Sequence, residues 1–110
     1  MSVLLINPFT VPLDKADEFV RDWTKTTEMY SKSGSGLIET HMHRRTGVGS
    51  ASFEFINIAT WESTAAFEAA HAAYSPSEEK IPGVVAHPAL YEAIIDDVFI
   101  KDKAKSKAKP

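Results

Sequence analysis

The clearest pattern in this chain is an alternation of side chains over residues 53–61. On an extended strand, successive side chains point to opposite faces, so odd-numbered and even-numbered positions separate. The odd face carries two phenylalanines, a carboxamide, a small residue and an indole, namely Phe53, Phe55, Asn57, Ala59 and Trp61. A carboxamide among aromatic side chains is more typical of a ligand cavity than of a plain core.

A second asparagine, Asn7, lies in the first apolar segment among Val3, Leu5 and Phe9. A buried amide without a hydrogen-bond partner costs about 1–3 kcal/mol. A ligand oxygen is one partner that would satisfy both amides. Two structural interpretations stand beside this one: Asn57 as an ordinary hydrogen-bonding core residue, and Asn7 as part of the turn chemistry before a proline.

The remaining hydrophobic and polar positions predict alternating strands and helices. Strands are expected over residues 3–9, 37–45, 51–61 and 91–100, and a turn over 46–50 joins the second strand to the third. A second helix is expected after Ser63, a favoured N-cap residue. The first helix is expected from a stripe that we interpret as core-facing: Ala16, Phe19, Val20, Trp23, Thr27 and Tyr30.

The order β-α-β-β-α-β predicts a ferredoxin-like α+β fold, with two helices on one face of a four-stranded antiparallel sheet. The apolar second face of such a sheet still needs a cover. A symmetric partner is the simplest cover, so we expect a homodimer.

Composition narrows the function classes. The chain has 110 residues, 44% of them hydrophobic, which suits one domain. It has no cysteine, which excludes disulfides and thiolate chemistry. No apolar run approaches about 18 residues, so we expect no membrane span. The first residues lack the features of a signal peptide, and we therefore expect a cytoplasmic protein.

The net charge of −3 is an average over two unlike parts. Residues 101–110 contain five lysines and one aspartate, and without them the body has seven basic and fourteen acidic residues. Such an acidic body is a poor nucleic-acid surface. We therefore divide the chain into a domain over residues 1–100 and a flexible lysine-rich tail over residues 101–110.

Three titratable residues of the second strand suggest two kinds of chemistry. Glu39, His41 and His43 alternate and share a face, a spacing that can chelate zinc or iron. No separate segment offers an obvious fourth ligand, so we predict no metal site. The alternative is a histidine that acts as a base near neutral pH, and His43 is the preferred candidate.

Three segments resemble the antibiotic biosynthesis monooxygenase domain: residues 5–12, residues 36–44, and residues 55–63 with their Asn-x-x-x-Trp-Glu-Ser motif. The resemblance extends over residues 3–71 and is weak in the last third. It implies a homodimer whose sheets pack together as a dimeric α/β barrel. It also implies a cofactor-independent monooxygenase, in which a small aromatic, phenolic or quinol-like substrate reduces dioxygen directly, without flavin or metal.

The resemblance also implies roles for individual residues. Asn57 would hold and polarise a substrate oxygen, and Trp61 would donate its indole N–H to a reduced oxygen species. Asn7 would hold a second oxygen, with His43 as the catalytic base. The substrate site would further include three aromatic residues, Phe53, Phe55 and Phe67.

Two positions depart from the pattern of the polyketide-oxidising members. Phe67 stands where those enzymes can carry a tyrosine, so a hydroxyl is missing. Ile81 stands near an expected arginine, and the adjacent Lys80 does not reproduce the planar fork of a guanidinium.

Two other functions remain open. Haem-degrading members carry a tryptophan and a proximal histidine on or after the second helix, and those positions fall near Ala70 and Lys80, although Asn7 fits. The second alternative is a protein that only binds a hydrophobic ligand. A polar group able to take a substrate proton discriminates between catalysis and binding. If neither His41 nor His43 faces the pocket, simple binding becomes the better interpretation.

Overall fold

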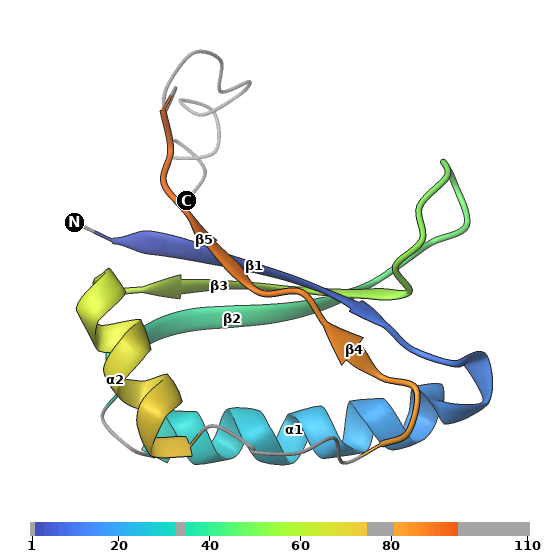
Figure 1. Ribbon diagram of the computed structural model, residues 1–110, viewed down its shortest axis with the longest axis horizontal. Coiled ribbons are helices and arrows are strands. Elements are labelled where there is room, and N and C mark those ends of the chain that lie inside the picture. Colours follow the sequence, from blue (N-terminus) through green and yellow to red (C-terminus); the bar gives the residue numbers. More distant parts are fainter. Residues whose placement is uncertain (1, 33–34, 75–80, 95–110) are drawn as a thin grey trace, which may run out of the picture.

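The computed structural model describes residues 2–32, 35–74 and 81–94. These residues form an antiparallel sheet and two helices, as Figure 1 shows. The elements are β1 (Val3–Thr10), the 3-10 turn η1 (Leu13–Lys15), α1 (Ala16–Lys32), β2 (Leu37–Arg44), β3 (Phe55–Trp61), α2 (Thr64–Tyr74), β4 (Val85–Ala86) and β5 (Ala89–Tyr91). In these described ranges no helix is long and apolar enough to cross a membrane.

The sheet has the strand order β2-β3-β1-β4, and β5 pairs with β1 as well. All of these pairs are antiparallel. Both helices lie on the same side of the sheet (Figure 1). The predicted ferredoxin-like α+β fold is therefore confirmed. We call the helix-covered side the inner face and the opposite side the outer face.

Burial along β3 alternates strictly, and Phe55, Asn57, Ala59 and Trp61 are all buried on the inner face. The alternation predicted for this segment is thus confirmed, but the strand is shorter than expected. Pairing with β1 ends at the Phe9–Phe55 pair, so the predicted strand residues 51–54 precede β3.

The last strand also differs from the prediction. β4 and β5 pair with β1 at residues 85–86 and 89–91, before most of the expected strand over residues 91–100. Residues 95–100, and the predicted tail over residues 101–110, lie outside the described residues.

The inner face buries two separate apolar clusters. The first cluster consists of Phe9, Val11, Ala16, Phe19, Phe55 and Ile81. The second cluster consists of Leu5, Ala59, Trp61 and Ala70. On β1, Phe9 belongs to the first cluster and Leu5 to the second, and Asn7 lies between these two residues. Asn57 lies in the same way between Phe55 and Ala59 on β3.

A register shift in β2 decides which of its side chains face inward. The pairing with β3 is irregular between Leu37 and Glu39, so that Leu37 pairs with Trp61 and Thr40 with Ala59. One extra residue reverses the faces of all later positions in a strand. Thr40 therefore shares the inner face with Leu37, whereas His41 and His43 lie on the outer face opposite Ile58 and Ile56.

The junction between β3, α2 and β2 is closely packed. Ser63 caps α2 as predicted, since the Ala66 backbone N–H donates to Ser63 Oγ at 3.0 Å. Gly36 has a φ of +87°, and a Cβ added there would lie 2.8 Å from Ala66 Cβ. Its carbonyl accepts a hydrogen bond from the Glu62 N–H at 2.9 Å. Only glycine fits this contact without strain.

We expect Gly36→Ala to lower the free energy of unfolding more than Gly47→Ala. Gly47 has a φ of +100° but no atom within 4 Å of an added Cβ, so its variant measures backbone strain alone, about 1–2 kcal/mol. Gly36→Ala adds a steric overlap, worth about 1–3 kcal/mol more. Urea unfolding of both variants measures the difference. Equal costs would show that α2 can move away from Gly36 freely.

Candidate active site

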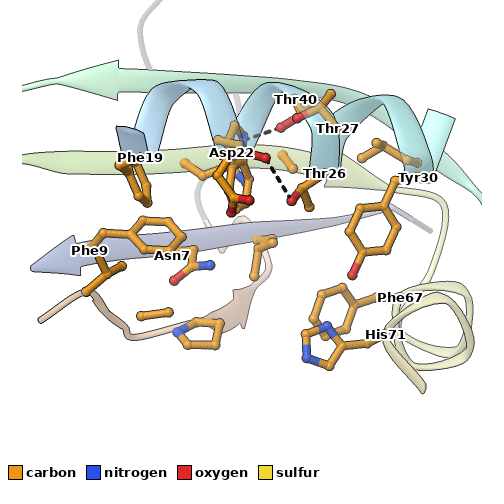
Figure 2. Close-up of a pocket in the computed structure, with 18 of the residues that line it drawn as sticks. Asn7, Phe9, Phe19, Asp22, Thr26, Thr27, Tyr30, Thr40, Phe67 and His71 are labelled. Carbon is orange, nitrogen blue, oxygen red and sulfur yellow. Dashed lines mark hydrogen bonds between the residues drawn. The ribbon is translucent and has the colours of Figure 1, made fainter. Parts of the chain in front are cut away.

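A cavity of about 320 Å³ lies between the inner face of the sheet and the two helices. Its walls come from β1, β2, β3, α1, α2 and the segment 81–88. Figure 2 shows the side chains around it, with Asn7 and Asp22 on one side and Tyr30, Phe67 and His71 on the other. Most of the lining is apolar, as expected for a site that holds a small organic ligand.

Asn7 and Asn57 form a directly opposed pair on β1 and β3. Both line the cavity, and they are only 8% and 2% exposed. Directly opposed side chains of antiparallel strands have Cβ atoms about 4.5–5.5 Å apart. The fold therefore brings two residues that are fifty positions apart in sequence into one carboxamide pair.

Hydrogen bonds from the protein engage the oxygen of each carboxamide. Thr40 Oγ1 donates to Asn57 Oδ1 at 2.8 Å, and the His87 backbone N–H donates to Asn7 Oδ1 at 3.1 Å. A carboxamide carries one acceptor oxygen and one NH₂ donor group. With their oxygens engaged, the two asparagines have NH₂ groups left to donate. The pair is therefore suited to a ligand that presents acceptor oxygens.

Trp61 lies on the same face of β3, about 13 Å from Asn57 along the strand. Its ring meets those of Tyr30 and Phe67 edge-on, with centroids 6.0 Å and 5.4 Å away. Trp61 is 3% exposed and lines the cavity, and its buried Nε1 has no hydrogen-bond partner among the described residues. Buried donors in proteins normally have a hydrogen-bond partner, and an acceptor atom of a bound ligand would supply one here.

Tyr30 lines the same end of the cavity, although the sequence pattern marked it only as part of a core-facing stripe. The phenol of Tyr30 is protonated at neutral pH, and burial raises its pKa further. Figure 2 shows its ring pointing from α1 toward Phe67. A phenol hydroxyl, missing at Phe67, is thus present nearby on another element.

Asp22 and His71 also line the cavity, and sequence reasoning missed both. Asp22 lies three positions after Phe19, a spacing that places two residues on neighbouring parts of a helix surface. That spacing was a usable signal. His71 stacks on Phe67, with centroids 5.2 Å apart and ring planes at 24°.

The structure brings four of the seven expected site residues to the cavity wall: Asn7, Asn57, Trp61 and Phe67. Phe55 is instead packed inside the first cluster, with its ring centroid 4.8 Å from that of Phe19. Phe53 precedes β3, and its ring lies against His87, with centroids 5.3 Å apart.

His43, expected as the base of the pocket, lies on the exposed outer face. The extra residue in β2 turns it away from the cavity, and His41 turns away with it. His41 Nε2 lies 3.3 Å from Glu39 Oε1. Among the described residues, no group of three or more histidine, aspartate or glutamate side chains could hold a metal ion.

Comparison with solved structures identifies several similar proteins. A proposed monooxygenase from Shewanella loihica PV-4 is 31% identical, with 86% of this chain and 96% of that chain covered and a TM-score of 0.68. SnoaB, a cofactor-independent oxygenase from Streptomyces nogalater, is 21% identical, with 89% and 98% covered and a TM-score of 0.65.

MhuD, a heme-degrader from Mycobacterium tuberculosis, is 22% identical, with 86% and 97% covered and a TM-score of 0.60. SnoaB and MhuD share the fold alone, whereas the Shewanella protein also shares enough sequence to indicate a family. No protein-family model matches the chain, and no curated protein does.

We expect Thr40→Val to destabilise the protein by about 1–3 kcal/mol, because it leaves the buried Asn57 Oδ1 without its donor. Thr10→Val, at an exposed position of β1, serves as the control and should cost under about 0.5 kcal/mol. Chemical denaturation of both variants measures the difference. A Thr40→Val protein as stable as the wild type would show that Thr40 does not hold Asn57.

Proposed function

The chain belongs to the antibiotic biosynthesis monooxygenase family, and from that premise we propose that it oxidises a small aromatic, phenolic or quinol-like substrate with dioxygen. The proposed reaction uses neither a flavin nor a metal. In this proposal Asn57 and Asn7 bind substrate oxygens. Trp61 donates its indole N–H to a reduced oxygen species. Phe67 and Tyr30 contact the ring system.

The carboxamide pair is the observation that carries the proposal. Its oxygens accept hydrogen bonds from Thr40 and from the His87 backbone, so its NH₂ groups favour a ligand oxygen with negative charge. Fixed donors in a site that excludes water stabilise an anion far better than donors in water do. An enolate or phenolate is the form of such a substrate that carries its charge on oxygen.

The chemistry follows from that anion. Loss of a proton from an acidic O–H or C–H bond leaves an electron-rich enolate or phenolate. One electron passes from this anion to dioxygen, and the resulting substrate radical and superoxide combine through a new C–O bond. Protonation of the peroxide and loss of water then leave a carbonyl. For a reacting CH₂ group, the sum is one dioxygen consumed and one carbonyl and one water formed.

The aromatic side chains that line the cavity support a ring system as substrate. Ala59 lies between Asn57 and Trp61 on the inner face, and its small side chain leaves room above β3. Trp61 and Phe67 line the far end, where their rings meet edge to face with centroids 5.4 Å apart. A ligand that reaches from the carboxamide pair to Trp61 therefore extends along the strand.

Simple ligand binding is the second candidate, because neither His41 nor His43 lines the cavity. That argument is offset by three titratable side chains that do line it, Asp22, Tyr30 and His71. Haem turnover has less support, because a buried Ala70 stands near the expected tryptophan position. Titration with haemin, followed at the Soret band, tests that branch directly.

We expect Asn57→Ala and Trp61→Phe to lower the rate of oxygen uptake with a hydroxyanthrone by about 10²–10³-fold, the usual cost of losing one donor to a developing anion. Leu13→Ala is the control, since Leu13 is exposed and does not line the cavity. Its rate should stay within a few-fold of wild type. An oxygen electrode measures all three, and circular dichroism verifies folding. Wild-type rates for Asn57→Ala and Trp61→Phe would remove both residues from the site.

We also propose that the protein is a homodimer that packs through the outer face. The centre of that face is aliphatic, with Leu4 and Ile6 on β1 next to Ile58 and Ile56 on β3. No described helix covers it (Figure 1). Contiguous apolar surface of this kind marks an interaction site.

Ile58→Lys places a charge at the centre of the outer face, and we expect it to convert the dimer to a monomer. Val48→Lys introduces the same side chain in an exposed position between β2 and β3 and should leave the dimer intact. Sedimentation velocity distinguishes the two states. A dimer that survives Ile58→Lys, or a monomeric wild type, would argue against this interface.

A further inference from the structure

We propose that Asp22 is the group that takes the substrate proton. The class of substrate is taken from the proposed function, on which this inference rests. Asp22 takes the role of base that was expected of His43. Among the described residues, Asp22 is the only carboxylate that lines the cavity. A proton acceptor in a cofactor-independent oxygenation must contact the substrate, and Asp22 is placed to do so.

The position of Asp22 on α1 sets it apart from the other acidic residues of that helix. Asp17, Glu18 and Glu28 are all exposed, whereas Asp22 is half-buried on the side that faces the sheet. Figure 2 shows its carboxylate directed from α1 into the cavity, on the side where Asn7 lies. Asp22 is therefore the acidic residue of α1 that a ligand in the cavity can contact.

The two other titratable groups of the cavity wall are poorer candidates. The phenol of Tyr30 is already protonated at neutral pH and burial raises its pKa further, so it is a poor acceptor for a substrate proton. His71 is exposed and stacked on Phe67, at the end of the cavity opposite Asn7 (Figure 2). Asp22 alone lies at the end where the carboxamide pair would hold a substrate oxygen.

These donors and this acceptor set two requirements for a test substrate. The NH₂ groups of Asn7 and Asn57 select a carbonyl or phenolate oxygen, and the Asp22 carboxylate selects an acidic hydrogen of the same ring system. An anthrone, which is an aromatic ketone with an acidic CH₂ group conjugated to its carbonyl, meets both requirements and serves as the probe.

The proton-transfer step balances without another reagent. The C–H bond breaks, its proton passes to a carboxylate oxygen of Asp22, and its electron pair moves onto the ketone oxygen held by the asparagines. After dioxygen has added to the carbon, Asp22 returns the proton to the peroxide. The carboxylate is thereby restored for the next turnover.

The test separates proton removal from oxygenation. Purified full-length protein is mixed with anthrone in D₂O without oxygen, and NMR follows the exchange of the CH₂ protons for deuterium. The variants are Asp22→Asn, which keeps the size of the side chain, and Asp22→Ala. Glu28→Gln removes one negative charge from an exposed position on the same helix and is the matched control.

We expect the wild type and Glu28→Gln to accelerate exchange, and Asp22→Asn to lose about 10²-fold or more of the acceleration, as for other general bases. Added formate should restore exchange to Asp22→Ala in proportion to its concentration, which a purely structural role would not produce. If Asp22→Asn fails to fold, formate rescue of Asp22→Ala and the activity of Asp22→Glu decide the question.

Three results would overturn the role of Asp22: no exchange by the wild type, full exchange by Asp22→Asn, or no response of Asp22→Ala to formate. Oxygen uptake with the same anthrone in air is then measured separately. Exchange without oxygen uptake supports Asp22 and rejects the monooxygenase function. Oxygen uptake that survives Asp22→Asn supports that function and rejects Asp22.

Discussion

The direct pairing of Asn7 with Asn57 across β1 and β3 is the constraint around which the inner face is arranged. Two buried carboxamides in the middle of a sheet divide the apolar core into two clusters. They are tolerated because Thr40 and the His87 backbone satisfy their oxygens. The free energy lost by burying these amides is thus offset at the oxygens, and the nitrogens are left for a ligand.

The two apolar clusters hold the walls of the cavity in place. Phe19 of α1 packs on Phe9 and Phe55, with ring centroids 5.0 Å and 4.8 Å apart, which fixes one end of the helix against the sheet. At the other end, Tyr30 meets Trp61 edge-on. Because α1 is fixed at both ends, Asp22 in its middle is held at a defined place in the cavity wall.

The hydrogen-bonding character of the site follows from the asparagine oxygens, which already accept hydrogen bonds from the protein. Amide NH₂ groups and an indole N–H supply donors, and one carboxylate supplies an acceptor. Such a site can favour the anion of a weakly acidic substrate without any bound cofactor, since it stabilises the charge and accepts the proton. The substrate itself would supply the electrons for dioxygen, which is why the proposed chemistry needs no cysteine, flavin or metal.

The sequence by itself determined the fold class, the inner face of β3 and the presence of Asn57 and Trp61 on it, because side-chain alternation is a local property of a strand. It also indicated Asn7 and Phe67. Only the tertiary structure paired Asn7 with Asn57, since strand register depends on contacts fifty residues apart in the chain.

The tertiary structure likewise turned His43 away from the cavity through one extra residue in β2. It left Phe55 in the core, because α1 packs on that ring. It also brought Asp22 and Tyr30 inward, because which side of a helix faces a cavity depends on where that helix packs.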